Sequence, residues 1–229
     1  MINGQKITGR MVMTVILLVL FLLVMSFHHI PKILHEIIGL VWLIAALIHI
    51  WQNRRWFTSF GKGQWDLVRA INTIISIGLI IGLLVAVAAG SGISHHLFKG
   101  IMPMDIRRSI TLQQLHVSLP YYLLIFMGLH WGLHFDSWLS QWKNALNIDL
   151  PAKASRIIAV VLPMAIIFGG IYGSILNRVG DRLLMLHIFG TEAVNEPMGI
   201  YVLLLLAIMG MYVVIGRFIR KNERYKRTS

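Results

Sequence analysis

The chain contains no cysteine among its 229 residues. This absence excludes disulfide bonds, thiolate haem ligands, iron–sulfur clusters held by this chain and covalent c-type haem attachment. Acidic residues are also scarce, with nine Asp and Glu against 21 Lys and Arg. The formal charge of +12 suggests nucleic acid at first sight, but the basic residues are spread between apolar runs. We therefore expect no nucleic-acid partner.

The remaining composition is strongly apolar, with 57% hydrophobic and only 13% charged residues. These values are typical of an integral membrane protein, which contacts membrane lipid. The sequence predicts an all-α, polytopic membrane helical bundle of about six transmembrane helices, forming a single membrane domain over residues 1–229. The apolar runs lie near residues 11–28, 33–51, 67–89, 111–134, 156–175 and 198–217.

Positive charge is distributed unevenly between the two sides of this bundle. With six spans both termini share one side, which carries 15 of the Lys and Arg residues against six on the other. The positive-inside rule then places the N- and C-termini in the cytoplasm. The basic tail, residues 217–229, is expected to lie against anionic headgroups, or to act only as a topology anchor.

Two histidine pairs share one spacing. His35 and His49 are fourteen residues apart, as are His116 and His130, so each pair lies on one helix face, separated by roughly 21 Å. The predicted topology makes the second and fourth spans parallel. His35 then meets His116 near the outer leaflet, and His49 meets His130 near the inner one. This pattern predicts two b-type haems, each held by two axial imidazoles from facing helices.

Small residues lie on the same face of the second span. Gly39 and Ala46 leave room for a flat macrocycle, and Trp42 is placed between two of them. On the fourth span Gly128 and Gly132 flank His130 and would allow close approach. The haem-binding core is expected over about 11–134, with accessory helices over about 156–217.

His134 follows His130 by one helical turn and so shares nearly the same face. It is the alternative ligand for the inner haem, or a hydrogen-bonding partner of a propionate or a quinone. His130 is favoured because only His130 repeats the fourteen-residue interval. Candidate partners of the anionic propionates, or else topology and headgroup anchors, are Arg54, Arg55, Arg107 and Arg108.

The other histidines fall in the outward-facing connections. We interpret them mainly as solvated loop residues, with proton release, metal binding and partner docking as alternatives: His28, His29, His95, His96 and His187. Glu36 either relays a proton beside His35 or points into the headgroups.

Two segments carry a family resemblance. His35-Glu36-Ile-Ile-Gly39 through His49, Asn53, Arg55 and Trp56 resembles an HE-x-x-G … H-x-x-x-N-x-R/K-W pattern. Gly128-Leu129-His130-Trp131-Gly132-Leu133-His134 resembles a GLHxGLH helix, and Ala207-Ile208-Met209-Gly210 through Ile215-Gly216 is also similar.

These patterns are similar to those of a family of small bacterial membrane di-haem b-type cytochromes, long catalogued as a domain of unknown function and related to ferric-reductase-like cytochromes. The resemblance implies location in the bacterial cytoplasmic (inner) membrane and transmembrane electron transfer. It also implies an extracytoplasmic or membrane redox partner, often flavin-carrying, and exchange with a quinone such as menaquinone or ubiquinone. The chain itself shows no flavin or nicotinamide motif.

Three functions follow as hypotheses. The leading one is an electron conduit between a quinol or cytoplasmic-side donor and an extracytoplasmic acceptor. The second is a quinone-reactive cytochrome b subunit of a larger respiratory dehydrogenase or reductase. The third, from another class, is a haem-free metal or proton transporter, which predicts carboxylates within the spans. Only Glu36, Asp66 and Asp136 come close.

Overall fold

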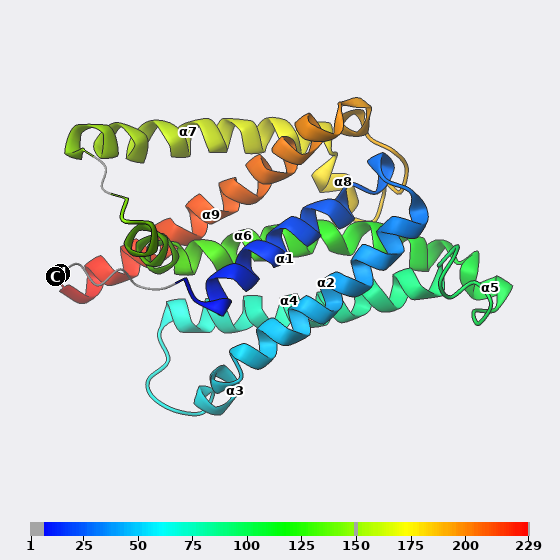
Figure 1. The fold of residues 1–229 in the computed structure, drawn as a ribbon, viewed down its shortest axis with the longest axis horizontal. Coiled ribbons are helices and arrows are strands. Elements are labelled where there is room, and N and C mark those ends of the chain that lie inside the picture. Colours follow the sequence, from blue (N-terminus) through cyan, green and yellow to red (C-terminus); the bar gives the residue numbers. More distant parts are fainter. Residues whose placement is uncertain (1–6, 149–150, 229) are drawn as a thin grey trace.

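The computed structural model describes residues 7–148 and 151–228, and over these residues it is helical without strands. Its long helices form a bundle in which neighbours in sequence alternate in direction (Figure 1). They are α1 (Gly9–Met25), α2 (Lys32–Gln52), α4 (Leu67–Gly92), α6 (Ile110–Leu146), α7 (Ala152–Leu176) and α9 (Met198–Thr228). Short helices in the connections are η1 (Phe27–His29), α3 (Arg55–Ser59), α5 (Met104–Arg107), α8 (Val179–Leu183) and η2 (Glu192–Asn195).

Side chains that precede three of the long helices fix where these helices begin. Thr8 accepts a hydrogen bond from the Met11 amide before α1, Asp66 accepts one from Arg69 before α4, and Ser109 accepts one from Leu112 before α6. Each satisfies an amide that has no partner within its own helix.

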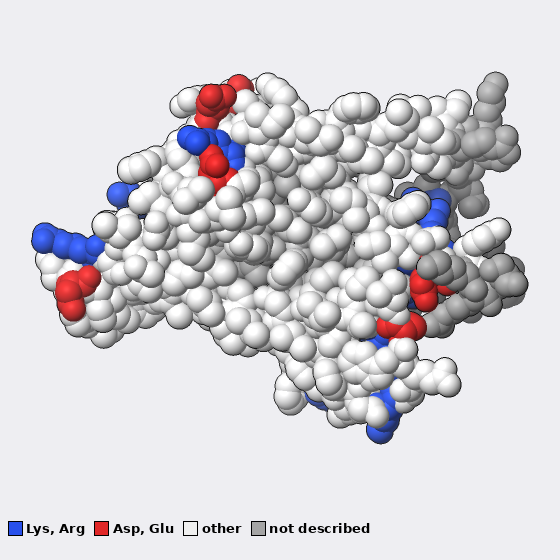
Figure 2. Space-filling model, turned by 180° about the vertical axis from the view of Figure 1, so that it is seen from behind, with Lys and Arg blue, Asp and Glu red and all other residues white. Residues whose placement is uncertain are grey.

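The membrane prediction holds in its coarser form. Four helices, α2, α4, α7 and α9, contain stretches long and apolar enough to cross a bilayer. Helix α1 has only 17 residues, and α6 is long enough but carries histidines, glutamines and tyrosines that lower its hydropathy. Six spans therefore stay a prediction. Figure 2 shows Lys, Arg, Asp and Glu gathered toward the two ends of one face, with an uncharged band between them.

Helix α6 packs extensively on both α4 and α9, and α7 packs on α9. Glycines set the α6–α9 distance, since a Cβ atom at Gly128 would lie 2.6 Å from the Met209 carbonyl oxygen. The pairs Gly78/Gly82 and Gly169/Gly173 also face side chains or backbone of a neighbouring helix. These glycines serve helix packing, as expected of small residues in membrane bundles.

Helices α1 and α2 pack mainly against each other and contact the rest of the bundle at few positions. Helices α2 and α6 run in the same direction, and α1 begins at the end of the bundle where α9 ends (Figure 1). The parallel arrangement expected for the second and fourth long helices is therefore present. We call the end at which α2 and α6 begin the outer end, and the end that holds the start of α1 the inner end.

Candidate functional site: two cavities along the histidine pairs

The outer histidines lie close together. The ring centres of His35 on α2 and His116 on α6 are 5.9 Å apart, with perpendicular ring planes at 89°. Nδ1 of His35 donates to the Val24 carbonyl at 3.0 Å, and Nδ1 of His116 donates to the Ala86 carbonyl at 2.9 Å. Because a carbonyl can only accept, both Nε2 atoms keep their lone pairs. Metal-binding imidazoles are commonly oriented in this way.

Two glycines make room at this level. A Cβ atom at Gly90 on α4 would lie 2.5 Å from Cε1 of His116, so only glycine permits this ring position. A Cβ atom at Gly39 on α2 would meet nothing within 4 Å, and Gly39 lines the outer cavity. The space expected beside Gly39 is present. Gly90 was not identified from the sequence, because its role depends on a neighbour 26 positions along the chain.

The outer cavity has a volume of about 340 Å³ and is lined by both His35 and His116. Ligand-binding cavities typically measure about 300–1,000 Å³. Its walls come from α1, α2, α4 and α6 and also from the segments beyond, through Arg182 and Tyr201. The helices predicted to be accessory therefore contribute to the wall of this cavity.

The inner histidines line a second cavity of about 1120 Å³. Nδ1 of His49 and Nδ1 of His130 are both buried and have no hydrogen-bond partner among the described residues. His134 lines the same cavity, but its Nε2 lies 3.1 Å from Oδ1 of Asn72 on α4. His130 thus has no hydrogen-bond partner at Nδ1 among the described residues, whereas His134 is engaged by Asn72; which of the two would face a haem beside His49 stays a prediction.

Trp42 separates the two levels. This side chain is only 7% exposed, lines both cavities and lies 5.1 Å from the Phe21 ring. Leu123 on α6 also lines both. Trp42 therefore lies against both cavities, and its place between two haems stays a prediction. Ala46 lines the inner cavity.

Gly128 and Gly132 allow a close approach to α9. Cβ atoms at these glycines would clash with the backbone of Met209 and Val213 on α9. The close approach that they allow is therefore between α6 and α9.

The four arginines proposed as propionate partners are not all placed for that role. Arg55 lines the inner cavity. Arg54 stacks on the Trp51 ring at 4.7 Å, Arg107 donates to the Ser94 carbonyl at 3.4 Å, and Arg108 is exposed. None of these three lines either cavity.

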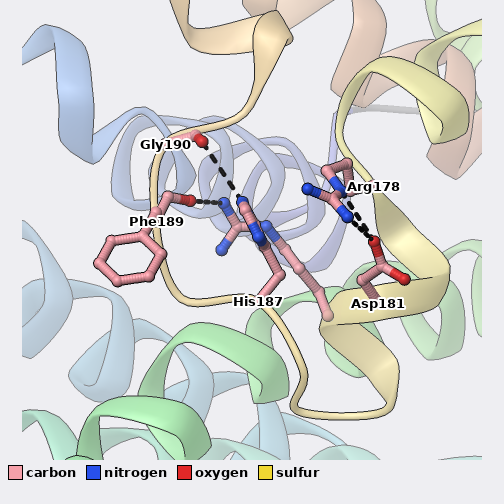
Figure 3. Close-up of polar contacts among 6 residues, drawn as sticks. Arg178, Asp181, His187, Phe189 and Gly190 are labelled. Carbon is pink, nitrogen blue, oxygen red and sulfur yellow. Dashed lines mark hydrogen bonds and ion pairs between the residues drawn. The ribbon is translucent and has the colours of Figure 1, made fainter.

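The arginine that does line the outer cavity is Arg182 on α8, which the sequence did not single out. It is only 4% exposed and donates to the Phe189 carbonyl at 2.7 Å. Figure 3 shows this carbonyl in the loop after α8, beside the contact of His187 with the Gly190 carbonyl and the Arg178–Asp181 ion pair. No sequence signal marked Arg182, because its spacing relates to neither histidine pair.

Glu36 holds a loop at the outer end. Its carboxylate accepts hydrogen bonds from the Ser94 hydroxyl and from the amides of His95, His96 and Leu97, at 2.8 to 3.2 Å. The sequence suggested a proton relay or a headgroup contact for Glu36. It did not suggest that Glu36 holds this loop through hydrogen bonds. The side chains of His95 and His96 are exposed.

The two other histidines near the outer cavity, His28 and His29, make few contacts with other residues. Nε2 of His29 donates to the Glu196 carbonyl at 2.9 Å, and its ring lies 4.9 Å from that of Tyr201. His28 lines the outer cavity. Partial burial and the positive charge of Arg182 lower the pKa of His28, so this imidazole is neutral near pH 7.

These residues fit a planar cofactor held between paired imidazoles. Across the described part of the chain, no group of three or more His, Asp or Glu side chains is placed to bind a metal ion on its own. The donors come in twos beside the two cavities, and in the inner pair the buried Nδ1 atoms lack hydrogen-bond partners among the described residues. A haem supplies four of its iron's ligands itself and needs only the two axial ones from protein.

Comparison with known proteins gives no matching family model, no matching curated protein and no matching solved structure. The resemblance to the di-haem b-type cytochromes therefore rests on the quoted motifs alone.

Proposed function

We propose that the chain is a b-type cytochrome that carries electrons across the bacterial cytoplasmic membrane through two haems. The observation that supports it most is the outer pair, His35 and His116, whose rings lie 5.9 Å apart with each Nδ1 tied to a backbone carbonyl. Metal–imidazole bonds of about 2 Å on either side of one metal fit between rings at this separation. His49 and His130 follow these two residues by fourteen positions each, on helices that run parallel.

In this proposal the haems supply one-electron chemistry, and the protein supplies ligands, orientation and a low-dielectric path. His35 and His116 hold the outer haem, and His49 and His130 hold the inner one. Trp42 fills the space between them. The positive-inside rule places both termini in the cytoplasm, so the inner haem faces a quinol or cytoplasmic-side donor and the outer haem an extracytoplasmic redox partner.

A second candidate function, quinone chemistry at the inner level, draws support from the larger inner cavity. At about 1120 Å³ it has more than three times the volume of the outer one, and its wall includes the His134–Asn72 contact. An imidazole beside an amide can hydrogen-bond a quinone carbonyl and exchange a proton with it. Here the chain acts as the quinone-reactive subunit of a larger complex.

Spectroscopy of the purified protein tests the proposal. We expect a reduced-minus-oxidised b-type spectrum with two haems per chain, falling to one in His35→Ala or His130→Ala. His187→Ala, which removes an imidazole that lines neither cavity, is the matched control and should keep both. A folded, colourless wild-type protein would contradict the proposal and favour a haem-free transporter. His134→Ala with an unchanged spectrum but lost quinol oxidation would support the quinone function.

A further inference from the structure

Arg182 is a buried cation without a carboxylate partner among the described residues. Its side chain is 4% exposed. The adjacent carboxylate of Asp181 pairs instead with Arg178 at 2.6 Å, and Glu36 is engaged by the loop that follows α4. A guanidinium stays charged at all ordinary pH values, and a buried charge without a counter-ion is costly. An anion is therefore expected beside it.

The hydrogen bonds of Arg182 point to where that anion would lie. One terminal nitrogen donates to the Phe189 carbonyl, as the dashed line in Figure 3 shows, and the guanidinium lies over the Tyr121 ring at 5.1 Å. Its Nε–H is buried and has no acceptor in the described part of the chain. The side chain lines the outer cavity together with His35 and His116.

The backbone around α8 directs this side chain into the bundle. Arg178 and Met185 have left-handed conformations, with φ of 49° and 58°, on either side of the short helix. The preceding Asn177 is fully buried and accepts a hydrogen bond from the Tyr121 hydroxyl at 3.3 Å. Two non-glycine residues with positive φ in so short a segment are unusual and persist only where surrounding contacts hold them.

We propose that Arg182 binds a propionate carboxylate of the outer haem. The guanidinium fork matches a carboxylate in geometry as well as in charge. Lys32 and His28 also line this cavity, but both are exposed, so Arg182 is the buried cation of the site. The assignment rests on the proposed function and gives α8 a role that the division into core and accessory helices did not provide.

Haem titration tests the contact without relying on electron-transfer activity. In a His49→Ala background, only the outer site is expected to bind haem. Haem-depleted protein is titrated with iron protoporphyrin IX and with its dimethyl ester, which lacks both carboxylates. We expect the ester to bind at least about tenfold more weakly than the acid, since one hydrogen bond to a charged group is worth about that factor. Arg182→Gln should weaken binding of the acid by a similar factor. This variant should bind the acid and the ester with nearly equal affinity.

Arg178→Gln is the matched control, because Arg178 is exposed and already paired with Asp181; it should behave like the parent. Arg182→Lys, which keeps the charge but not the fork, should fall between Arg182→Gln and the parent. Should Arg182→Gln fail to fold, the comparison of acid and ester is made in Arg182→Lys, in which a contact by Arg182 predicts a smaller difference between acid and ester than in the parent.

Three results would overturn the assignment. Equal binding of acid and ester by the parent would exclude a propionate contact while leaving the proposed function intact. If Arg182→Gln weakens binding of the acid and of the ester by the same factor, Arg182 does not contact a propionate. It would then bind another anion, such as a lipid phosphate. Binding of neither porphyrin by the wild type would overturn the cytochrome function itself.

Discussion

Gly39 offers a test at the scale of one residue, because an added methyl group meets no protein atom there. A Cβ atom at Gly39 would have nothing within 4 Å, and alanine favours a helix by up to about 1 kcal/mol over glycine. We expect Gly39→Ala to fold at least as stably as the wild type and yet to lose much of its outer haem, because the methyl group enters the cofactor's space. Haem content per folded chain, measured beside the thermal unfolding temperature, checks this.

Gly199→Ala is the control for this substitution. Gly199 is also helical, also has open space around its Cβ position, and lines neither cavity. Two haems retained in Gly39→Ala would mean that the cofactor does not lie against this stretch of α2.

At the residue scale, the sequence predicted residues that belong to a periodic pattern and missed functional residues that occur singly. The matched intervals of the histidines and the stripe through Gly39 and Trp42 are periodic features, and periodicity can be read directly from a sequence. Gly90 and Arg182 are single residues whose roles come from helices distant in the chain. No local pattern distinguishes them from other glycines and arginines in loops or spans.

At the scale of helices, the α6–α9 contact depends on the absence of side chains. We expect Gly128→Val to destabilise the protein by about 1–3 kcal/mol, as overpacking does, because its side chain would overlap the Met209 carbonyl and the Tyr212 Cβ. Thermal unfolding in detergent measures the loss. Gly100→Val, at a loop position with nothing near its Cβ, should change the unfolding temperature little. An unchanged temperature in Gly128→Val would show that α9 can move away at no cost.

Most of the long helices were predictable because they are apolar runs, and hydropathy defines such runs; α6 is less apolar than the others. The short helices were not. Arg55–Ser59, Met104–Arg107 and Val179–Leu183 lie in polar connections and have only four or five residues each. Tertiary contacts at the ends of the bundle decide their conformation, and no periodic pattern can develop over a single turn.

At the scale of the whole molecule, the cavities lie between the α1–α2 hairpin and the rest of the bundle. Direct contacts across this boundary are few, so a ligand bound there contributes much of the contact surface. We expect haem removal to increase amide hydrogen exchange in α1 and α2 more than in the closely packed α6 and α9. Mass spectrometry of apo and haem-loaded protein in the same detergent measures this. Equal increases in all helices would mean that the cofactor stabilises the bundle uniformly.

The modest hydropathy of α6 has a consequence for how the protein is made. This helix carries His116, His130 and His134, and it is not among the stretches apolar enough to cross a bilayer on length and composition. A nascent segment with such polar residues partitions poorly into lipid by itself. Its strongly apolar partners, α4 and α9, are synthesised before and after it. Stable insertion of α6 is therefore expected only after α9 has also been synthesised, and uptake of the proposed haems would follow that step.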